Sequence, residues 1–384
     1  LCTMSVPFYN PAYRVGILGG GQLGRMLIQE AVNLNISISI LDPDPSAPCK
    51  NLVGEFVCGS LNDYDTVMRF GADKDLLTIE IEHVNVDALE HLEKQGKKVY
   101  PQPHVLRMIQ DKGEQKKFYQ QNNIPTAPFY LVENRAGIAL HGAEFPFFQK
   151  LRKGGYDGKG VTRLDDVNEL SKAFDEPSVL EKLVPFKKEI SVIVSRNENG
   201  EIAHFPVVEC EFNPIANLVE FLFSPSDISS KTEHDAIRIA REIAECSGIV
   251  GLLAVEMFVL DDDTVLVNEI APRPHNSGHH TIEANISSQY EQHLRAILNL
   301  PPGSTDIVRP AIMVNLLGED GYTGDAVYKG LEDILRIPGV FVHLYGKKTT
   351  KPFRKMGHVT ILADNISAAR SLARKVQSTL KIIA

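Results

Sequence analysis

The chain has 384 residues, of which 43% are hydrophobic and 23% charged, a composition typical of a globular protein with two or three domains. Its net charge of −9 argues against binding to nucleic acid or an acidic membrane surface, so an anionic substrate would need a local positive patch. The five scattered cysteines lack CxxC spacing, which favours a reducing cytoplasm over a disulfide framework or a zinc site. No apolar run approaches the length of a membrane span, and the first residues do not resemble a secretory signal.

The first hundred residues alternate short apolar strands with helices, which predicts a parallel sheet covered by helices. The expected strands are 14–18, 36–41, 56–58 and 76–81. The expected helices are 22–34, 64–70 and 86–95.

A glycine-rich turn links the first strand to the first helix. The segment from Gly19 to Gly24 satisfies G-x-G-x-x-G, and Asp42 ends the next strand, where an acidic residue would hold a ribose in a dinucleotide fold. Glycines let the backbone approach a ligand, and a helix N-terminus offers unpaired N–H groups. The motif therefore predicts an anion or nucleotide site, with an NAD(P) site or a tight structural turn as alternatives. An NAD(P)-dependent oxidoreductase is the rival function from another class.

A second glycine-rich segment, 150–160, follows a helix expected over 105–122 and a proline-rich stretch at 124–128. It contains four glycines and four cations. It does not match a Walker A loop, because Lys153 stands where glycine is needed and Gly160 where Ser or Thr is needed. The composition predicts a mobile flap that closes over phosphates, with a flexible basic hairpin as the alternative.

The stretch 179–189 is predicted to be a strand whose backbone can meet an adenine edge, and Glu189 could accept hydrogen bonds from ribose hydroxyls. A plain edge strand is the alternative. Further helices are expected near 167–174 and at 233–247, 287–300 and 366–380, and further strands at 311–316, 340–345 and 358–362. The predicted domains are 1–105, 106–190 and 191–384.

Two apolar runs joined by an acidic turn, 252–260 and 265–271, predict a β-hairpin. A turn centred on Asp262 and Asp263 would pair the residues as follows: Leu260 with Val265, Phe258 with Val267, and Glu256 with Glu269. Opposed residues have Cβ atoms about 5 Å apart, so the two carboxylates would repel each other.

A shared proton, a neighbouring cationic side chain or a divalent cation could relieve this repulsion between Glu256 and Glu269. A hard cation with oxygen ligands, Mg²⁺ carrying phosphates, fits best. The alternatives are two carboxylates on a solvated face and a hairpin in another register.

Five motifs in order along the chain together resemble one family. They are Gly20-Gly-Gln-Leu-Gly-Arg-Met26, Gly154-Gly-Tyr-Asp-Gly-Lys-Gly160, Asn268-Glu-Ile-Ala-Pro-Arg-Pro-His-Asn-Ser-Gly-His279, Gln289-Tyr-Glu-Gln-His-Leu-Arg-Ala296 and Arg354-Lys-Met-Gly-His358. The family is N5-carboxyaminoimidazole ribonucleotide synthetase, the ATPase-subunit type of phosphoribosylaminoimidazole carboxylase, within the ATP-grasp superfamily. The resemblance runs from about residue 13 to residue 365.

The resemblance implies an α/β ATP-grasp fold with three parts: a Rossmann-like parallel-sheet domain, a small lid and a C-terminal domain with a mixed or antiparallel sheet. It implies a ligase in which ATP phosphorylates bicarbonate to carboxyphosphate. The CO₂ released is then captured by the amine of 5-aminoimidazole ribonucleotide, in purine biosynthesis. ATP and Mg²⁺, as two ions, are the implied cofactors, and a cytoplasmic homodimer is the implied assembly.

The resemblance also implies roles for residues at the nucleotide. Lys112 and Lys150 would contact the ATP phosphates, Glu189 the ribose, and Glu256 and Glu269 the magnesium. The phosphate flap would consist of Gly155, Tyr156, Asp157, Gly158, Lys159 and Gly160. The adenine would be lined by Glu181, Lys182, Leu183 and Val184, with Asn268 beside the metal ligands.

For the remaining substrates, the resemblance implies that Arg273 stabilises charge on the transferring phosphoryl group, while His275 and Asn276 border bicarbonate and the imidazole. The ribonucleotide would be held by Lys347, Arg354, Lys355, Gln22, Leu23 and Glu80. Five cations between 347 and 355 give an acidic protein a patch suited to a phosphate monoester, although such runs are often only solvated faces.

The sequence departs from the family pattern at several places. Phe353 replaces a glycine and Lys351 an arginine, which puts backbone contact with the phosphate in doubt there. Cys210 and Phe212 stand where the family often has Asn and His, so no ligand role is assigned to them.

Two alternatives remain beside the carboxylation reaction and the oxidoreductase. A formate-dependent glycinamide ribonucleotide transformylase shares the Glu pair and the Pro-Arg-Pro-His segment, although the flap sequence favours carboxylation. A catalytically silent scaffold would not need the Glu pair and both lysines. Zinc binding by the histidines at 275, 279 and 280 is disfavoured, because Pro274 and Gly278 interrupt any helix there.

Overall fold

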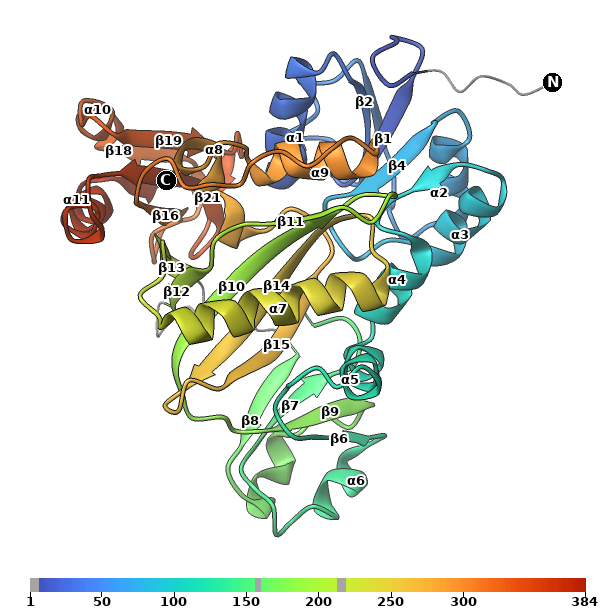
Figure 1. Cartoon of the computed structure of the whole chain (residues 1–384), viewed down its shortest axis with the longest axis vertical. Coiled ribbons are helices and arrows are strands. Elements are labelled where there is room, and N and C mark those ends of the chain that lie inside the picture. Colours follow the sequence, from blue (N-terminus) through green and yellow to red (C-terminus); the bar gives the residue numbers. More distant parts are fainter. Residues whose placement is uncertain (1–6, 156–159, 213–218) are drawn as a thin grey trace.

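The computed structural model describes residues 7–155, 160–212 and 219–384. A parallel five-stranded sheet, a four-stranded sheet and a nine-stranded sheet carry most of the fold. The parallel sheet (blue) lies at one end of the long axis and the four-stranded sheet (green) at the other, with the large sheet between them (Figure 1). Within the described residues, no helix is both long and apolar enough to cross a lipid bilayer.

The N-terminal strands pair in the order β3-β2-β1-β4-β5, and every pair is parallel, as predicted. The strands are β1 Arg14–Leu18, β2 Ser37–Asp42, β3 Glu55–Cys58, β4 Leu76–Ile79 and β5 Lys98–Val99. The helices are α1 Gln22–Asn33, α2 Tyr64–Gly71 and α3 Val86–Lys94. Because parallel strands end at one edge of the sheet, the first glycine loop, Asp42 and Glu80 meet there.

The single helix expected over 105–122 is wrong. The chain forms α4 Pro103–Ile109 and α5 Lys112–Gln121, separated by a two-residue break. The Asp111 carboxylate accepts the backbone N–H groups of Gly113 and Glu114 and so starts a new helix. The Gln115 side chain donates to the Ile109 carbonyl at 2.7 Å, which satisfies an acceptor at the end of α4. The break makes Lys112 the first residue of α5.

The antiparallel four-stranded sheet has the order β6-β9-β7-β8. Its strands are β6 Phe129–Val132, β7 Phe147–Leu151, β8 Val161–Leu164 and β9 Ser178–Lys182. Because β9 pairs on both sides, the edge-strand alternative for 179–189 is wrong for this strand. Helix α6 Arg135–Ala139 and the 3-10 helix η1 Val167–Lys172, which replaces the helix expected near 167–174, contribute to a small apolar core beneath the sheet.

The large sheet has the order β15-β14-β10-β12-β13-β16-β21-β19, and β11 adds to β10. Helix α7 Ser230–Ser247 packs on β10 and β14 over the most extensive apolar core described, capped by Ser229 at its start and left-handed Gly248 at its end. The strands are β10 Phe186–Arg196, β11 Ile202–His204, β12 Val208–Phe212, β13 Val219–Ser224, β14 Gly251–Leu260, β15 Val265–Ala271, β16 Ala311–Leu317, β19 Val340–Leu344 and β21 Lys355–Leu362.

The hairpin β14–β15 forms as predicted, but its register is only partly the predicted one. Glu256 faces Glu269, whereas Phe258 faces Leu266 and Val259 faces Val265, so the two predicted pairs nearer the turn are wrong. The turn is one residue shorter than expected, since the Leu260 N–H donates to the Thr264 carbonyl, and Asp263 adopts φ 67°. A β-bulge at residue 268 offsets this difference and restores the register at the two glutamates.

The C-terminal part joins the large sheet to the N-terminal one. Helix α9 Gln289–Ile297 packs against both α1 and β14, and Figure 1 shows it between the two sheets. Helix α11 Ile366–Thr379 covers β16 and β21 over a second core. The remaining elements are η2 Asn276–Gly278, α8 Thr281–Ala284, β17 Gly324–Asp325, β18 Val327–Lys329, α10 Leu331–Leu335, β20 Thr349–Thr350 and β22 Lys381–Ile383.

Candidate active site

The two opposed glutamates form the acidic centre of the candidate site. Burial, together with the nearby charges of Glu269 and Glu189, raises the pKa of Glu256 to about 8. Burial also opposes ionisation of Glu269, but Lys112 and Lys150 outweigh it and lower that pKa to about 2. One carboxylate of the pair is therefore already neutralised by lysine, and the other retains a site for a cation or a proton.

The two lysines predicted to contact phosphate both reach this centre. The Lys112 ammonium lies 2.7 Å from Glu269 Oε2. The Lys150 ammonium, on β7, donates to Asn268 Oδ1 at 3.0 Å. Asn268 is the bulged residue of β15, so the irregularity that corrects the hairpin register also directs this amide at Lys150.

A buried pairing that the sequence did not reveal holds Lys150 from its other side. Glu181, only 5% exposed, accepts from Lys150 at 2.6 Å and from Lys116 at 2.9 Å. Burial opposes ionisation of Glu181, but the two lysines lower its pKa to about 2. Lys116 also donates to Thr126, whose hydroxyl bonds the Val267 carbonyl of β15. The Glu181 carboxylate is thus occupied by the two lysines, and its backbone lies in a strand that is paired on both sides.

The residues that follow Glu181 differ in direction. The Lys182 side chain leads away from Lys150, since its ammonium donates to the Glu144 carbonyl and lies 4.5 Å from the centre of the Phe147 ring. Leu183 and Val184 are half-buried beyond the end of β9. They lie on the connection to β10, outside any strand, so their backbone groups are not used by the sheet.

Glu189 lies on β10 beside the acidic pair. Burial raises its pKa to about 7, although Lys150 acts in the opposite direction. Cys210 faces it on β12, and burial with the nearby charges of Glu256 and Glu189 raises the pKa of this thiol. Cys210 is therefore a neutral neighbour of the acidic group, and Glu189 retains carboxylate oxygens to accept hydrogen bonds.

The loop after β15 contributes three polar side chains. Arg273 Nε lies 2.8 Å from Glu82 Oε1, a residue that follows the parallel sheet and that the sequence did not single out. Burial and the charge of Arg273 lower the pKa of His275 to about 3, so the ring is neutral. Its Nδ1 accepts from the Ser277 backbone, which leaves the proton on Nε2, 3.4 Å from Glu256 Oε1.

Asn276 forms a pair with Asn315 of β16 that sequence reasoning missed. Each amide nitrogen donates to the other amide's oxygen, at 2.9 and 3.0 Å. Asn315 also donates to the Val219 carbonyl, so the pair fixes the loop carrying Arg273 and His275 to the middle of the large sheet.

The first glycine loop is filled by carboxylates of the chain itself. Gly20 N–H donates to Asp42 at 2.6 Å, and Gly21 and Gly24 N–H donate to Glu80 at 2.5 Å each. These donors are the groups a pyrophosphate would use at a helix N-terminus, so the NAD(P) alternative loses its binding groups. Gln22 and Leu23 open α1 immediately beside Glu80.

The C-terminal cationic segment approaches this same edge. The charge of Arg354 contributes, after two hydrogen bonds from Ser46, to lowering the pKa of Asp44. Lys347 donates to the Lys355 carbonyl at 2.6 Å, which closes the segment into a loop. Phe353 adopts φ 61°, a backbone region that glycine enters without strain. The chain therefore has a phenylalanine at a position where the backbone conformation favours glycine.

The predicted flap is only partly described. Tyr156, Asp157, Gly158 and Lys159 lie outside the described residues. Gly155 and Gly160 lie close together, since a Cβ added to Gly160 would be 3.2 Å from the Gly155 α-carbon. The Leu151 N–H donates to the Gly160 carbonyl at 2.8 Å, which joins the two ends of the segment beside Lys150.

The donor set suits a hard divalent cation. Two carboxylates face each other, and a cation would offset the burial and the repulsion by Glu269 that raise the pKa of Glu256. Over 7–155, 160–212 and 219–384, no group of three or more His, Cys, Asp or Glu side chains is arranged to hold a metal ion. Glu256 and Glu269 would therefore supply part of a coordination shell and leave the remaining positions to phosphate and water.

Three family models match successive parts of the chain. They are the ribonucleotide synthetase preATP-grasp domain over 12–110, the ATP-grasp domain over 117–290, and the phosphoribosylaminoimidazole carboxylase C-terminal domain over 311–372. The second glycine-rich segment, Lys112, Lys150 and the Glu pair fall in or beside the middle match.

Solved structures and curated relatives agree with these models. The N5-carboxyaminoimidazole ribonucleotide synthetase of Thermotoga maritima is 40% identical with a TM-score of 0.89, over 97% of this chain and 99% of that one. The enzyme of Aspergillus clavatus, solved with ADP and 5-aminoimidazole ribonucleotide, is 33% identical with a TM-score of 0.87, over 95% and 98%. A chloroplastic phosphoribosylaminoimidazole carboxylase of Vigna aconitifolia is 39% identical over 93% of this chain, which spans 65% of that longer protein.

Proposed function

Because the chain belongs to the N5-carboxyaminoimidazole ribonucleotide synthetase family of ATP-grasp ligases, we propose that it carboxylates 5-aminoimidazole ribonucleotide with bicarbonate at the expense of ATP. The products are N5-carboxyaminoimidazole ribonucleotide, ADP and phosphate. The observation that carries the proposal is the Glu256–Glu269 pair held between Lys112 and Lys150. That arrangement suits phosphoryl transfer, which needs positioning and charge stabilisation more than covalent work.

The reaction has two bond-forming stages. A bicarbonate oxygen attacks the γ-phosphorus of ATP, the bond to the β-phosphate oxygen breaks, and ADP leaves. Carboxyphosphate then divides into CO₂ and phosphate. The ribonucleotide amine attacks the CO₂ carbon, forms the N–C bond and loses one proton, which phosphate can accept. Because carboxyphosphate hydrolyses readily in water, a covering flap favours the productive path.

The nucleotide roles follow from the contacts around Lys150. Lys112 and Lys150 bind the phosphates, and each exchanges part of its present carboxylate contact for phosphate oxygen. Glu189 accepts from the ribose hydroxyls. The residues around the adenine and phosphates are Glu181, Lys182, Leu183, Val184, Asn268 and the flap from Gly155 to Gly160.

Charge on the reacting groups is met by the loop after β15. Arg273 stabilises the transferring phosphoryl group, and neutral His275 and Asn276 border bicarbonate and the imidazole. Lys347, which closes the cationic segment 347–355 by donating to the Lys355 carbonyl, assists there. The ribonucleotide is bound where the cationic segment 347–355 approaches the first glycine loop. The residues that bind it are Gln22, Leu23, Glu80, Lys347, Arg354 and Lys355.

Magnesium is part of the proposal. Bound by Glu256 and Glu269, two Mg²⁺ ions would neutralise charge on the β- and γ-phosphates. Glu269 would also help to orient the phosphates through its contact with Lys112.

The domain division, the assembly and the location of the chain are proposals as well. We propose three domains, 1–105, 106–190 and 191–384, a homodimer and a cytoplasmic location, all of which rest on the family resemblance. Sedimentation of the purified chain at micromolar concentration tests the dimer. The proposed reaction belongs to the region shared with the longer Vigna aconitifolia relative, of which this chain spans 65%.

The decisive experiment measures phosphate release from ATP with and without bicarbonate and aminoimidazole ribonucleotide, for the chain and for Glu269→Gln. We expect release to depend strongly on the ribonucleotide and to fall at least about 100-fold in the variant. Equal turnover with formate and glycinamide ribonucleotide would instead favour the transformylase. Binding of NADH with no response to ATP would favour the oxidoreductase, even though carboxylates of the chain itself occupy the first glycine loop.

A further inference from the structure

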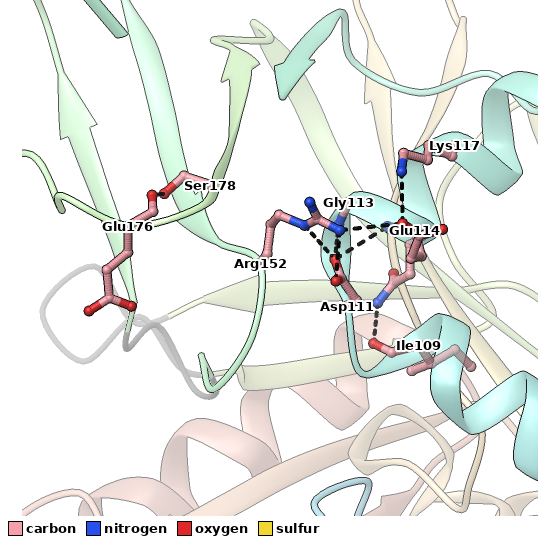
Figure 2. Close-up of polar contacts among 9 residues, drawn as sticks. Ile109, Asp111, Gly113, Glu114, Lys117, Arg152, Glu176 and Ser178 are labelled. Carbon is pink, nitrogen blue, oxygen red and sulfur yellow. Dashed lines mark hydrogen bonds and ion pairs between the residues drawn. The ribbon is translucent and has the colours of Figure 1, made fainter. Parts of the chain in front are cut away.

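An ion pair with no assigned role links the start of α5 to the end of β7. Arg152 donates to Asp111 through Nε and Nη2, to one carboxylate oxygen each, at 2.8 Å (Figure 2). The side chains are 20% and 9% exposed. A fork-to-carboxylate pair of this kind fixes both partners in orientation as well as in distance.

The same carboxylate performs a second task. Asp111 Oδ1 also accepts the Gly113 N–H at 2.8 Å, and so caps α5. Burial opposes its ionisation, but Arg152 lowers the pKa of this carboxyl below its ordinary value. In addition, the Lys112 N–H donates to the Arg152 carbonyl at 2.9 Å. A backbone hydrogen bond and a side-chain ion pair thus join the start of α5 to the end of β7 beside Lys112.

Gly113 completes the arrangement by leaving space. A Cβ at this position would lie 2.6 Å from Arg152 Nε and 3.1 Å from Asp111 Oδ1. Any side chain there would push the guanidinium off the carboxylate, and Figure 2 shows the three residues in direct contact. Glu114 adds a longer contact to Arg152 at 3.3 Å.

The pair adjoins both lysines of the proposed phosphate site along the chain. Lys112 directly follows Asp111, and Lys150 precedes Arg152 by two residues on β7. We propose that Asp111, Gly113 and Arg152 form a clamp that positions the ammonium groups of Lys112 and Lys150 for the nucleotide phosphates. All three are positioning residues, and the clamp rests on the proposed nucleotide site. Arg152, although it belongs to the cation-rich glycine segment, is not a phosphate ligand.

A double-mutant cycle separates the clamp from the alternative that Arg152 binds phosphate directly. The variants are Asp111→Ser, which keeps a helix cap, Arg152→Ala, and the two combined. The readout is the Kd for Mg²⁺–ADP by calorimetry, below the unfolding temperature of each variant. We expect each single variant to bind about tenfold more weakly, and the double variant no more weakly than either.

The opposite pattern overturns the clamp. If Asp111→Ser binds as the parent does while Arg152→Ala loses affinity, or if the two losses multiply, Arg152 acts on the nucleotide by itself. The matched control is the exposed pair Arg163 and Asp165, on and after β8, at 2.7 Å, whose alanine variants should leave ADP affinity within about twofold.

Two further measurements keep the test independent of folding and of the reaction. Gly113→Ala retains every charge, so weaker ADP binding by it supports the clamp, and unchanged binding contradicts it. ADP binding needs neither bicarbonate nor ribonucleotide. If the parent chain fails to carboxylate the ribonucleotide but shows the coupled loss of ADP affinity, the clamp stands and the proposed reaction falls.

Discussion

The two glycine-rich segments resemble each other as sequence and differ as structures. In the segment from Gly19 to Gly24, the backbone N–H groups already bind Asp42 and Glu80, whose carboxylates come from neighbouring strands. At the second segment, the partners are side chains: Lys150 contacts Glu181 and Asn268, and Arg152 contacts Asp111.

This difference shows that a glycine motif does not by itself identify a ligand. The first loop uses its glycines to bring the chain's own acid, Glu80, against a helix N-terminus. At the second segment, Lys150 holds Glu181 and Asn268, and in the proposed function it exchanges part of these contacts for phosphate oxygen. Negative charge is therefore fixed at the first segment and exchangeable at the second.

The largest expected effect is at the exchangeable site. Lys150→Ala should lower ATP-dependent phosphate release by at least about 100-fold, because it removes a phosphate contact and leaves Glu181 with Lys116 alone. Steady-state assays with saturating ribonucleotide measure it. Lys172→Ala, an exposed lysine paired with Glu169, is the matched control and should change the rate less than about twofold. A rate for Lys150→Ala within about tenfold of the parent would contradict the assignment.

A second pair of variants tests why glycine is required in each of the two segments. Gly21 has φ −82°, so its backbone suits any residue, but an added Cβ would lie 2.6 Å from Glu80 Oε1. Gly154 has open space around it but φ +79°. Gly21→Ala should therefore cost about 3 kcal/mol by displacing a buried carboxylate, and Gly154→Ala about 1 kcal/mol by strain.

Urea unfolding measures both costs. In a Glu80→Ala background the penalty of Gly21→Ala should shrink, because the clashing carboxylate is gone, whereas that of Gly154→Ala should persist. Equal penalties at the two glycines, or no change in the Glu80→Ala background, would remove the distinction between the two segments.

Much of this architecture was predictable from local patterns. The parallel sheet follows from alternating strands and helices, and most boundaries fall within two residues of those expected. The Glu256–Glu269 pairing was also predicted correctly, but partly by compensation, since a shorter turn and the bulge at Asn268 shift the register by one residue each, in opposite directions. Register near a bulge depends on side chains from other segments, which the hairpin sequence does not contain.

The partners that hold the site could not be predicted, because they lie far apart in the chain. Glu82 pairs with Arg273, and Lys116 with Glu181, across long sequence separations. The break at Asp111 had a local signal, since Asp followed three residues later by Glu or Gln marks a helix start, and Asp111 is followed by Glu114.

The two segments should also respond in opposite directions to pH. The pKa of Glu181 is lowered to about 2 against an ordinary 4.5, so its contribution to stability is present above pH 4.5 and lost as the pH falls towards 2. Burial raises the pKa of Glu80, despite its hydrogen bonds from Gly24 and Gly21, so its contribution is present below 4.5 and lost as the pH rises.

Urea unfolding at pH 3 and pH 5 tests this contrast. Relative to the parent, Glu181→Gln should lose about 2 kcal/mol less stability on acidification from pH 5 to pH 3, since it has no carboxylate to protonate. Glu80→Gln should lose more than the parent does. Identical slopes for the two variants would mean that the two carboxylates are not held in different electrostatic states.

The smallest expected effect concerns a position where the backbone favours glycine and the chain has none. Phe353 lies at φ 61° with 40% of its surface exposed, so Phe353→Gly should relieve strain, lose little burial and stabilise the fold by about 0.5 kcal/mol. Phe341 in β19 is similarly exposed, at 41%, but does not have a positive φ. Phe341→Gly should therefore destabilise the fold by about 1 kcal/mol.

Thermal unfolding of both variants shows whether each substitution stabilises or destabilises the fold. A loss of stability in Phe353→Gly as large as in Phe341→Gly would show that the ring contributes packing that outweighs its strain. In that case, conformation alone would not explain why this cationic loop differs from the two glycine segments.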